Sequence, residues 1–63
     1  MRIARHKKTG NRYIIINENV IECTNGREDI KYVVYAKEKD NTIDWANVFC
    51  REQEEFFEKF EVI

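Results

Sequence analysis

The sequence predicts a small all-β domain, either a curled barrel or a strongly bent antiparallel meander, with one short helical turn near the C-terminus. Clusters of turn-forming residues recur at short intervals, and the segments between them are rich in β-branched and aromatic residues. The predicted strands also carry apolar residues on both faces, which is typical of a small barrel rather than of a flat sheet with one solvated side. With 63 residues, the chain has room for one domain with a thin core.

Four clusters of turn residues divide the chain. Asn25-Gly26 is the strongest, because both residues tolerate the positive φ that a type I′ hairpin requires. The other clusters span residues 8–11, 17–19 and 39–41. The segments between the clusters predict strands near residues 2–6, 12–17, 20–24, 30–37, 43–50 and 57–62.

The segment 30–37 shows the two-residue period of a strand most clearly. One set of alternating side chains is Ile30, Tyr32, Val34 and Ala36, and the other is Lys31, Val33, Tyr35 and Lys37. Because Tyr35 alternates with two lysines, we expect it to be exposed if Tyr32 lies inside the domain.

The C-terminal segment allows two interpretations. Residues 51–56 are polar and free of β-branched residues, so they can form a helical turn, and a longer helix would place Phe56, Phe57, Phe60 and Ile63 on one face. Alternatively, residues 57–62 alternate weakly and could close the barrel as a last strand. Propensity alone favours the longer helix.

Short motifs are spread over almost the whole chain. They are His6, Lys8, Gly10, Tyr13 and Ile15 near the start, Val33-Val34-Tyr35 in the middle, and Phe49-Cys50-Arg51-Glu52 with Phe56 and Phe60 near the end. This pattern resembles a small bacterial and phage domain family of unknown function, family 1653. In that family the last motif has Trp and Pro where this chain has Phe49 and Glu52. The resemblance implies an SH3-like barrel with a helical turn at residues 51–56 and a closing strand at 57–62, and it brings no established chemistry.

Charge is distributed unevenly along the chain, although the net charge is only −1. Residues 1–12 carry five arginines and lysines and no acid, whereas residues 51–63 are strongly acidic. We interpret the basic segment as a solvated strand that neutralises the acidic tail of the same domain. No apolar run could span a bilayer and no secretory signal is evident, so a cytoplasmic protein without membrane contact is expected.

Enzyme chemistry and metal binding have little support in the sequence. The chain contains no serine, and its single histidine, His6, lies in a basic run that does not favour a general base. Cys23 and Cys50 form no Cys-x-x-Cys pair, so neither a metal site nor a cofactor is expected. We interpret both cysteines as small buried hydrophobes, while a disulfide between them stays open.

The surplus of aromatic residues predicts a non-enzymatic module that binds a protein or peptide. Eight aromatic side chains are many for this length, and most of them must form the core. Tyr35 and Trp45 are the candidates for exposure, and Arg51 is the candidate anchor for a carboxylate or phosphate, or else the ion-pair partner of Glu54 or Glu55. If the chain is of phage origin, as the resemblance allows, its partner would be a host factor.

Two alternatives concern other partners. The basic segment, with Arg5, Lys8 and Tyr13, could bind nucleic acid, although the slightly acidic balance of the chain argues against it. A homodimer could form through the C-terminal apolar residues Phe57, Phe60, Val62 and Ile63, unless these residues close the barrel of the monomer.

Overall fold

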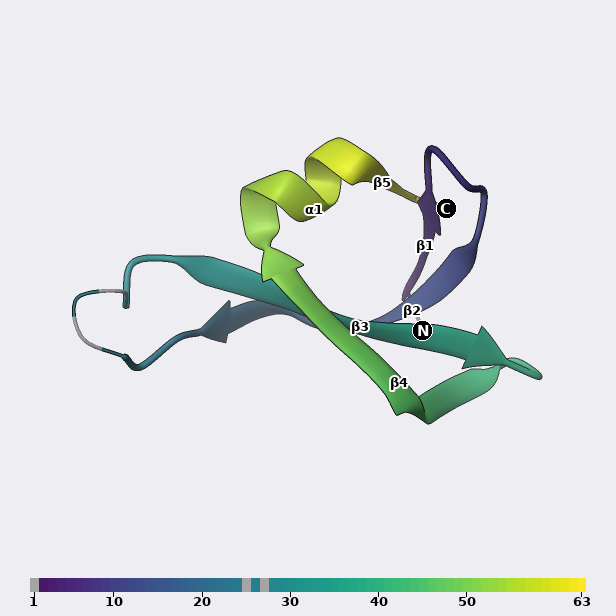
Figure 1. The fold of residues 1–63 in the computed structure, drawn as a ribbon, viewed down its shortest axis with the longest axis horizontal. Coiled ribbons are helices and arrows are strands. Elements are labelled where there is room, and N and C mark those ends of the chain that lie inside the picture. The colour runs from purple at the N-terminus through teal and green to yellow at the C-terminus, as the bar shows by residue number, and fades with distance from the viewer. Residues whose placement is uncertain (1, 25, 27) are drawn as a thin grey trace.

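A computed structural model describes residues 2–24, 26 and 28–63 of the chain. It contains one five-stranded antiparallel sheet and one short helix, so the predicted all-β class is confirmed (Figure 1). The elements are β1 (Arg2–His6), β2 (Arg12–Ile21), β3 (Lys31–Lys39), β4 (Thr42–Glu52), α1 (Gln53–Lys59) and β5 (Phe60–Val62). The described helix is too short to cross a membrane.

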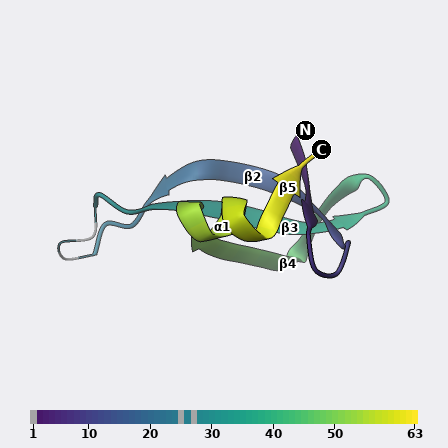
Figure 2. The ribbon, with the colours of Figure 1, turned by 90° about the horizontal axis from the view of Figure 1, so that it is seen from above.

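The sheet is a bent meander whose last strand returns to the first. The strand order is β4-β3-β2-β1-β5, so β4 and β5 are the two edges. β5 pairs antiparallel with β1, with Ala4 opposite Val62. Figure 2 shows α1 lying across β3 on one face of the sheet, which we call the inner face.

The core lies between this inner face and the C-terminal segment. It consists of Ala4, Ile15, Val33, Tyr35, Phe56 and Phe60, with Tyr13 packed against it. The rings of Phe56 and Phe60 stack with their centroids 4.4 Å apart and their planes 8° apart. Phe56 lies in α1, and Phe60 follows the last residue of the helix. Because residues four apart lie on one side of a helix, both rings are directed toward the sheet.

Tyr35 is buried, so the prediction that it is exposed was wrong. Its exposed fraction is 5%, and its ring contacts those of Phe56 and Phe60. The alternation in β3 was read correctly, but α1 covers the face that carries Tyr35. Tyr32, on the opposite face, is only half-buried.

The predicted turn at residues 17–19 is instead an irregularity within the single long strand β2. The pairing of β2 with β3 shifts register between Ile15 and Asn17 and again between Asn17 and Val20. A polar run in a paired strand can be absorbed as a bulge, which bends the strand without ending it.

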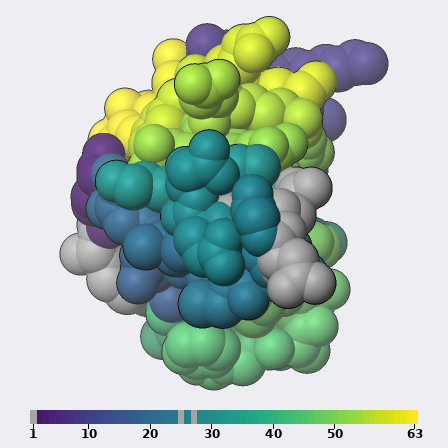
Figure 3. All heavy atoms as spheres, turned by 90° about the vertical axis from the view of Figure 1, so that its left-hand side faces the viewer, coloured from purple at the N-terminus to yellow at the C-terminus, as the bar shows by residue number. Residues whose placement is uncertain are grey.

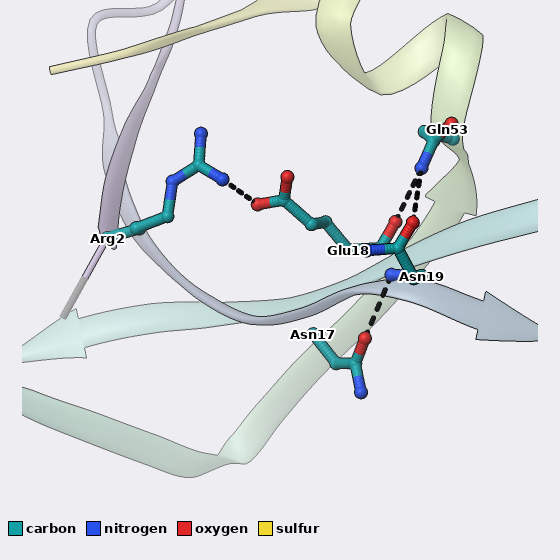
Figure 4. Close-up of polar contacts among 5 residues, drawn as sticks. All are labelled: Arg2, Asn17, Glu18, Asn19 and Gln53. Carbon is teal, nitrogen blue, oxygen red and sulfur yellow. Dashed lines mark hydrogen bonds and ion pairs between the residues drawn. The ribbon is translucent and has the colours of Figure 1, made fainter.

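Side chains from three elements hold this bulge in place (Figure 4). The Asn19 backbone N–H donates to the Asn17 side-chain oxygen at 2.8 Å. The Gln53 amide, at the start of α1, donates to the Glu18 carbonyl at 2.7 Å, and Arg2 forms an ion pair with Glu18. The bulge therefore fixes the position of the helix as well as the bend of β2.

The hairpin turns use residues that tolerate positive φ. Asp40 and Asn41 have φ values of 51° and 64°, as the two central residues of a type I′ turn require. Of the predicted Asn25-Gly26 turn, Asn25 lies outside the described residues, and Gly26 has a φ of 67°. Figure 3 shows this end of the β2–β3 hairpin in front, between the C-terminal segment (yellow) and atoms of β4 (green).

The C-terminal boundaries differ from those that the resemblance implied. The helix begins at Gln53 and continues to Lys59, so the turn predicted at 51–56 starts too early and the strand predicted at 57–62 shortens to Phe60–Val62. Residues 53–59 contain no β-branched residue, and acidic side chains in the first turn with Lys59 in the last suit the helix dipole.

Replacing Phe56 with alanine should destabilise the domain severely. The side chain is fully buried, and such a truncation costs about 3–5 kcal/mol, which is comparable to the whole stability of a domain of this size. Urea unfolding followed by circular dichroism measures the loss. Phe57→Ala, at a ring that is 38% exposed, is the matched control and should cost less than about 1 kcal/mol. Equal stability of the two variants would contradict the assignment of the core.

Deletion of residues 60–63 should unfold the chain at every concentration. Phe60 is a core residue with an exposed fraction of 3%, and β5 completes the pairing of β1. Circular dichroism and sedimentation over a range of concentrations test this. A folded monomer after the deletion would mean that the segment serves an interface between molecules instead.

Candidate functional site: an aromatic pocket between the sheet edges

A pocket of about 200 Å³ lies where the two sheet edges approach each other. It is lined by His6, Thr9, Asn11, Tyr13, Tyr35, Phe49, Arg51 and Phe60. Phe49 and Arg51 belong to edge strand β4, and Phe60 begins the other edge strand, β5. Drug-sized ligand sites are usually larger than about 300 Å³, so this volume suits a single side chain.

The Tyr13 ring stands nearly perpendicular to three other aromatic rings of the pocket. The Tyr13 ring stands at 83° to Tyr35, at 82° to Phe49 and at 79° to Phe60, with centroid distances of 5.4, 6.2 and 5.5 Å. Such edge-to-face contacts are favourable for aromatic pairs. The Tyr35 and Phe49 rings are tilted by 36° to each other, so the aromatic lining is not one flat platform.

Strand register explains why these residues meet. Tyr35 lies directly opposite Phe49, and Val33 lies opposite Arg51, so both β4 residues share the inner face with the core. Phe60 pairs with His6 across β5 and β1, and their rings meet edge to face at 4.8 Å. The pocket is thus the open end of the same layer that forms the core.

Arg51 supplies a fixed positive charge at the pocket wall. Its Nε donates to the Tyr35 hydroxyl at 3.0 Å, its Nη1 forms an ion pair with Glu55, and its guanidinium carbon lies 5.8 Å from the centre of the Phe60 ring. The Tyr35 hydroxyl, followed by Glu55, raises the pKa of Arg51 above its ordinary value although partial burial opposes this. These bonds use two of the roughly five N–H donors of a guanidinium.

The basic segment at the start of the chain is largely neutralised within the molecule. Its three arginines form the pairs Arg2–Glu18, Arg5–Glu61 and Arg12–Glu38. The pair of Arg5 with Glu61 is the contact with the acidic tail that the charge pattern predicts.

A lysine outside the basic segment also lies near the pocket. Among the described residues, Lys37, which lies opposite the pocket residue Tyr13, has no ion pair.

The structure brings together three of the six predicted binding residues. Tyr13, Tyr35 and Arg51 line the pocket. Arg5 lies outside it, and Lys8 lies in the turn between β1 and β2, next to the lining residue Thr9.

Trp45 is exposed but stands apart from the pocket. Its exposed fraction is 69%, and it lies beside the irregular part of β4, where pairing with β3 shifts between Ala36 and Glu38. Asp44 holds this bend by accepting hydrogen bonds from the Asn47 side chain at 2.8 Å and from the Ala46 backbone at 3.1 Å. Both hydrogen bonds lower the pKa of Asp44 below its ordinary value, and the bond from Asn47 has the larger effect.

Sequence reasoning missed His6, Phe49 and Phe60 as pocket residues. The alternation of Phe49 with Arg51 was available as a signal, because residues two apart on a strand share a face. Phe60 carried no comparable signal, since its position depends on where α1 ends.

Other groups of polar residues offer no comparable site. One hollow of about 400 Å³ is lined mainly by charged side chains near the start of β3 and the junction of β4 with α1. No group of His, Cys, Asp or Glu among the described residues is arranged to hold a metal ion. Cys23 and Cys50 are both free and exposed, so the disulfide left open by the sequence does not form, and their predicted burial was wrong.

Comparisons with protein-family models, curated proteins and solved structures found no match. The resemblance to family 1653 and to SH3-like barrels therefore stays a prediction. The function has to be inferred from the geometry of the pocket.

Replacing Tyr35 with phenylalanine should cost about 1 kcal/mol of stability. The substitution removes the acceptor for the Arg51 Nε–H, and hydrogen bonds to charged groups are worth somewhat more than neutral ones, although Arg51 keeps access to water. Tyr13→Phe is the matched control, because no hydrogen bond to its hydroxyl occurs within the described chain, and it should change stability by less than about 0.5 kcal/mol. Urea unfolding compares the two variants, and equal effects would rule out a role for the Tyr35 hydroxyl.

Proposed function

We propose that the protein is a non-enzymatic binding module that recognises a peptide segment of a partner protein by receiving one of its side chains in the aromatic pocket. The observation that carries this proposal is the pocket in which the Tyr13 ring stands edge-to-face with three aromatic rings and Arg51 forms part of the lining. The rings offer apolar contact, and the guanidinium offers directed donors for a carboxylate.

The polar groups of the pocket support binding rather than catalysis. His6 Nδ1 lies 3.3 Å from the Thr9 hydroxyl, which could suggest an activated nucleophile. However, the Thr9 backbone N–H also donates to the same Nδ1 atom at 3.3 Å. Part of the accepting capacity of Nδ1 is therefore used by the backbone of the turn between β1 and β2.

A peptide suits the pocket better than a nucleic acid does. Single-stranded nucleic acids are bound by stacking bases on open aromatic faces along a basic groove. Here the Tyr13 ring packs edge-to-face against Tyr35 and Phe49, so these rings do not form an open stacking surface. Arg5, one of the residues predicted to contact phosphates, is paired with Glu61. If the chain is of phage origin, as the resemblance allows, the partner would be a host protein.

The test is selection of binders from a library of random 12-residue linear peptides displayed on phage, with calorimetry on synthetic versions of the enriched sequences. Phe49→Ala should weaken their binding at least about tenfold, because it removes one of the aromatic rings that line the pocket. Trp45→Ala, at an exposed aromatic residue outside the pocket, is the matched control and should bind as the unaltered protein does.

Two outcomes would overturn the proposal. One is the absence of any peptide enriched over bare support. The other is salt-sensitive binding of an oligothymidylate of twelve nucleotides that is lost in the variant Arg5→Glu with Lys8→Glu, which would favour the nucleic-acid alternative.

A further inference from the structure

The pocket lies along an unpaired sheet edge. β4 is 11 residues long and pairs on one side with β3, and no strand among the described residues pairs with its other side. Figure 1 shows β4 crossing β3 and leading into α1. The backbone groups on such an edge can pair with an extended segment from another chain.

Both faces of this edge have recesses for alternating side chains. Phe49 and Arg51 line the aromatic pocket on the inner face. Cys50, which lies opposite Val34 and therefore points to the outer face, lines a second hollow of about 290 Å³. The remaining lining of that hollow is Val20, Glu22, Tyr32 and Val34, so its wall is mostly apolar.

An added strand would lie at the mouth of the aromatic pocket. Phe60, at the start of the opposite edge strand, forms the far wall of this pocket, while Phe49 and Arg51 form the near wall. A segment paired with β4 would therefore send alternate side chains toward the gap between the two edges.

Charge indicates the chemistry of that segment. Acidic side chains near the pocket are already paired, Glu55 with Arg51 and Glu38 with Arg12. Arg51 keeps further donors, and Lys37 on the same face has no ion pair in the described part of the chain. An acidic residue opposite Arg51 would complement this surface.

We propose that the partner segment binds as an additional antiparallel strand on β4. Read from its N-terminus, the segment has an acidic residue opposite Arg51, an apolar residue opposite Cys50 and an aromatic residue opposite Phe49. The proposal rests on the proposed function and adds the backbone conformation and the residue pattern of the partner.

The experiment uses the tightest-binding synthetic peptide from the library selection, with blocked ends. Each of its amide nitrogens is methylated in turn, which removes one N–H donor at a time. Since an edge strand bonds through alternate N–H groups, methylation at every second position should weaken binding about tenfold, and methylation between these positions should have a much smaller effect. Enriched sequences should contain an acidic and an aromatic residue two positions apart.

A second readout locates the strand on the protein. Hydrogen exchange measured by NMR should show new protection at backbone amides of β4 when the peptide is bound, and none at β5. Charge complementarity is tested by Arg51→Gln, which should lower affinity for the acidic peptide and leave affinity for its acid-to-amide version nearly unchanged.

The outcomes separate this inference from the proposed function. Peptide binding could be lost in Phe49→Ala and yet be unaffected by methylation at any amide. This result would support the pocket as a peptide site and would overturn the proposal that the peptide binds as a strand on β4. If sedimentation shows that the protein alone is a dimer with protected β4 amides, the occupant of the edge is a second copy, and the partner strand is overturned.

Discussion

The stacked pair of Phe56 and Phe60 is the contact on which the rest of this structure depends. It lays α1 against the inner face of the sheet, and it ends the helix where the chain must turn into β5. Directly after the stack, β5 pairs with β1 and forms the second edge of the sheet. Phe60 belongs to both the core and the pocket wall, so stability and binding share one side chain.

Local sequence chemistry predicted most of the fold. The predicted bounds of the first strand match β1, and the alternation in β3 assigned its side chains to the right two groups. The wrong predictions concern segments where tertiary contacts outweigh the local preference of the sequence for a turn, a helix or a strand. The polar run at residues 17–19 looks like a turn by itself, and only the contacts of Glu18 with Arg2 and Gln53 show that it is absorbed into β2. The end of α1 was placed too early because the resemblance outweighed the helical propensity of residues 53–59.

The candidate site was predictable in part, for the same reason. Periodicity shows which side chains share a face, but it does not show which face a later helix will cover. Tyr35 was therefore predicted as a binding residue because its ring was expected to be exposed. The ring is in fact buried, and Tyr35 contributes to the pocket as a lining residue whose hydroxyl accepts a hydrogen bond from Arg51. Trp45 met the expectation of exposure, yet the bend held by Asp44 separates it from the pocket.

The pairing of the two terminal strands has a mechanical consequence. The Ile63 backbone N–H donates to the Ile3 carbonyl at 2.9 Å, so both ends of the chain leave the fold at the same end of one short ladder (Figure 2). A force that pulls the two ends apart would load the hydrogen bonds of this ladder one after another. It would not load all of them together in shear. The opening would begin at Ile63 and would reach Phe60, which lies opposite His6 at the far end of the ladder, last. Tension on the ends would therefore disrupt the pocket and the core together, because Phe60 belongs to both.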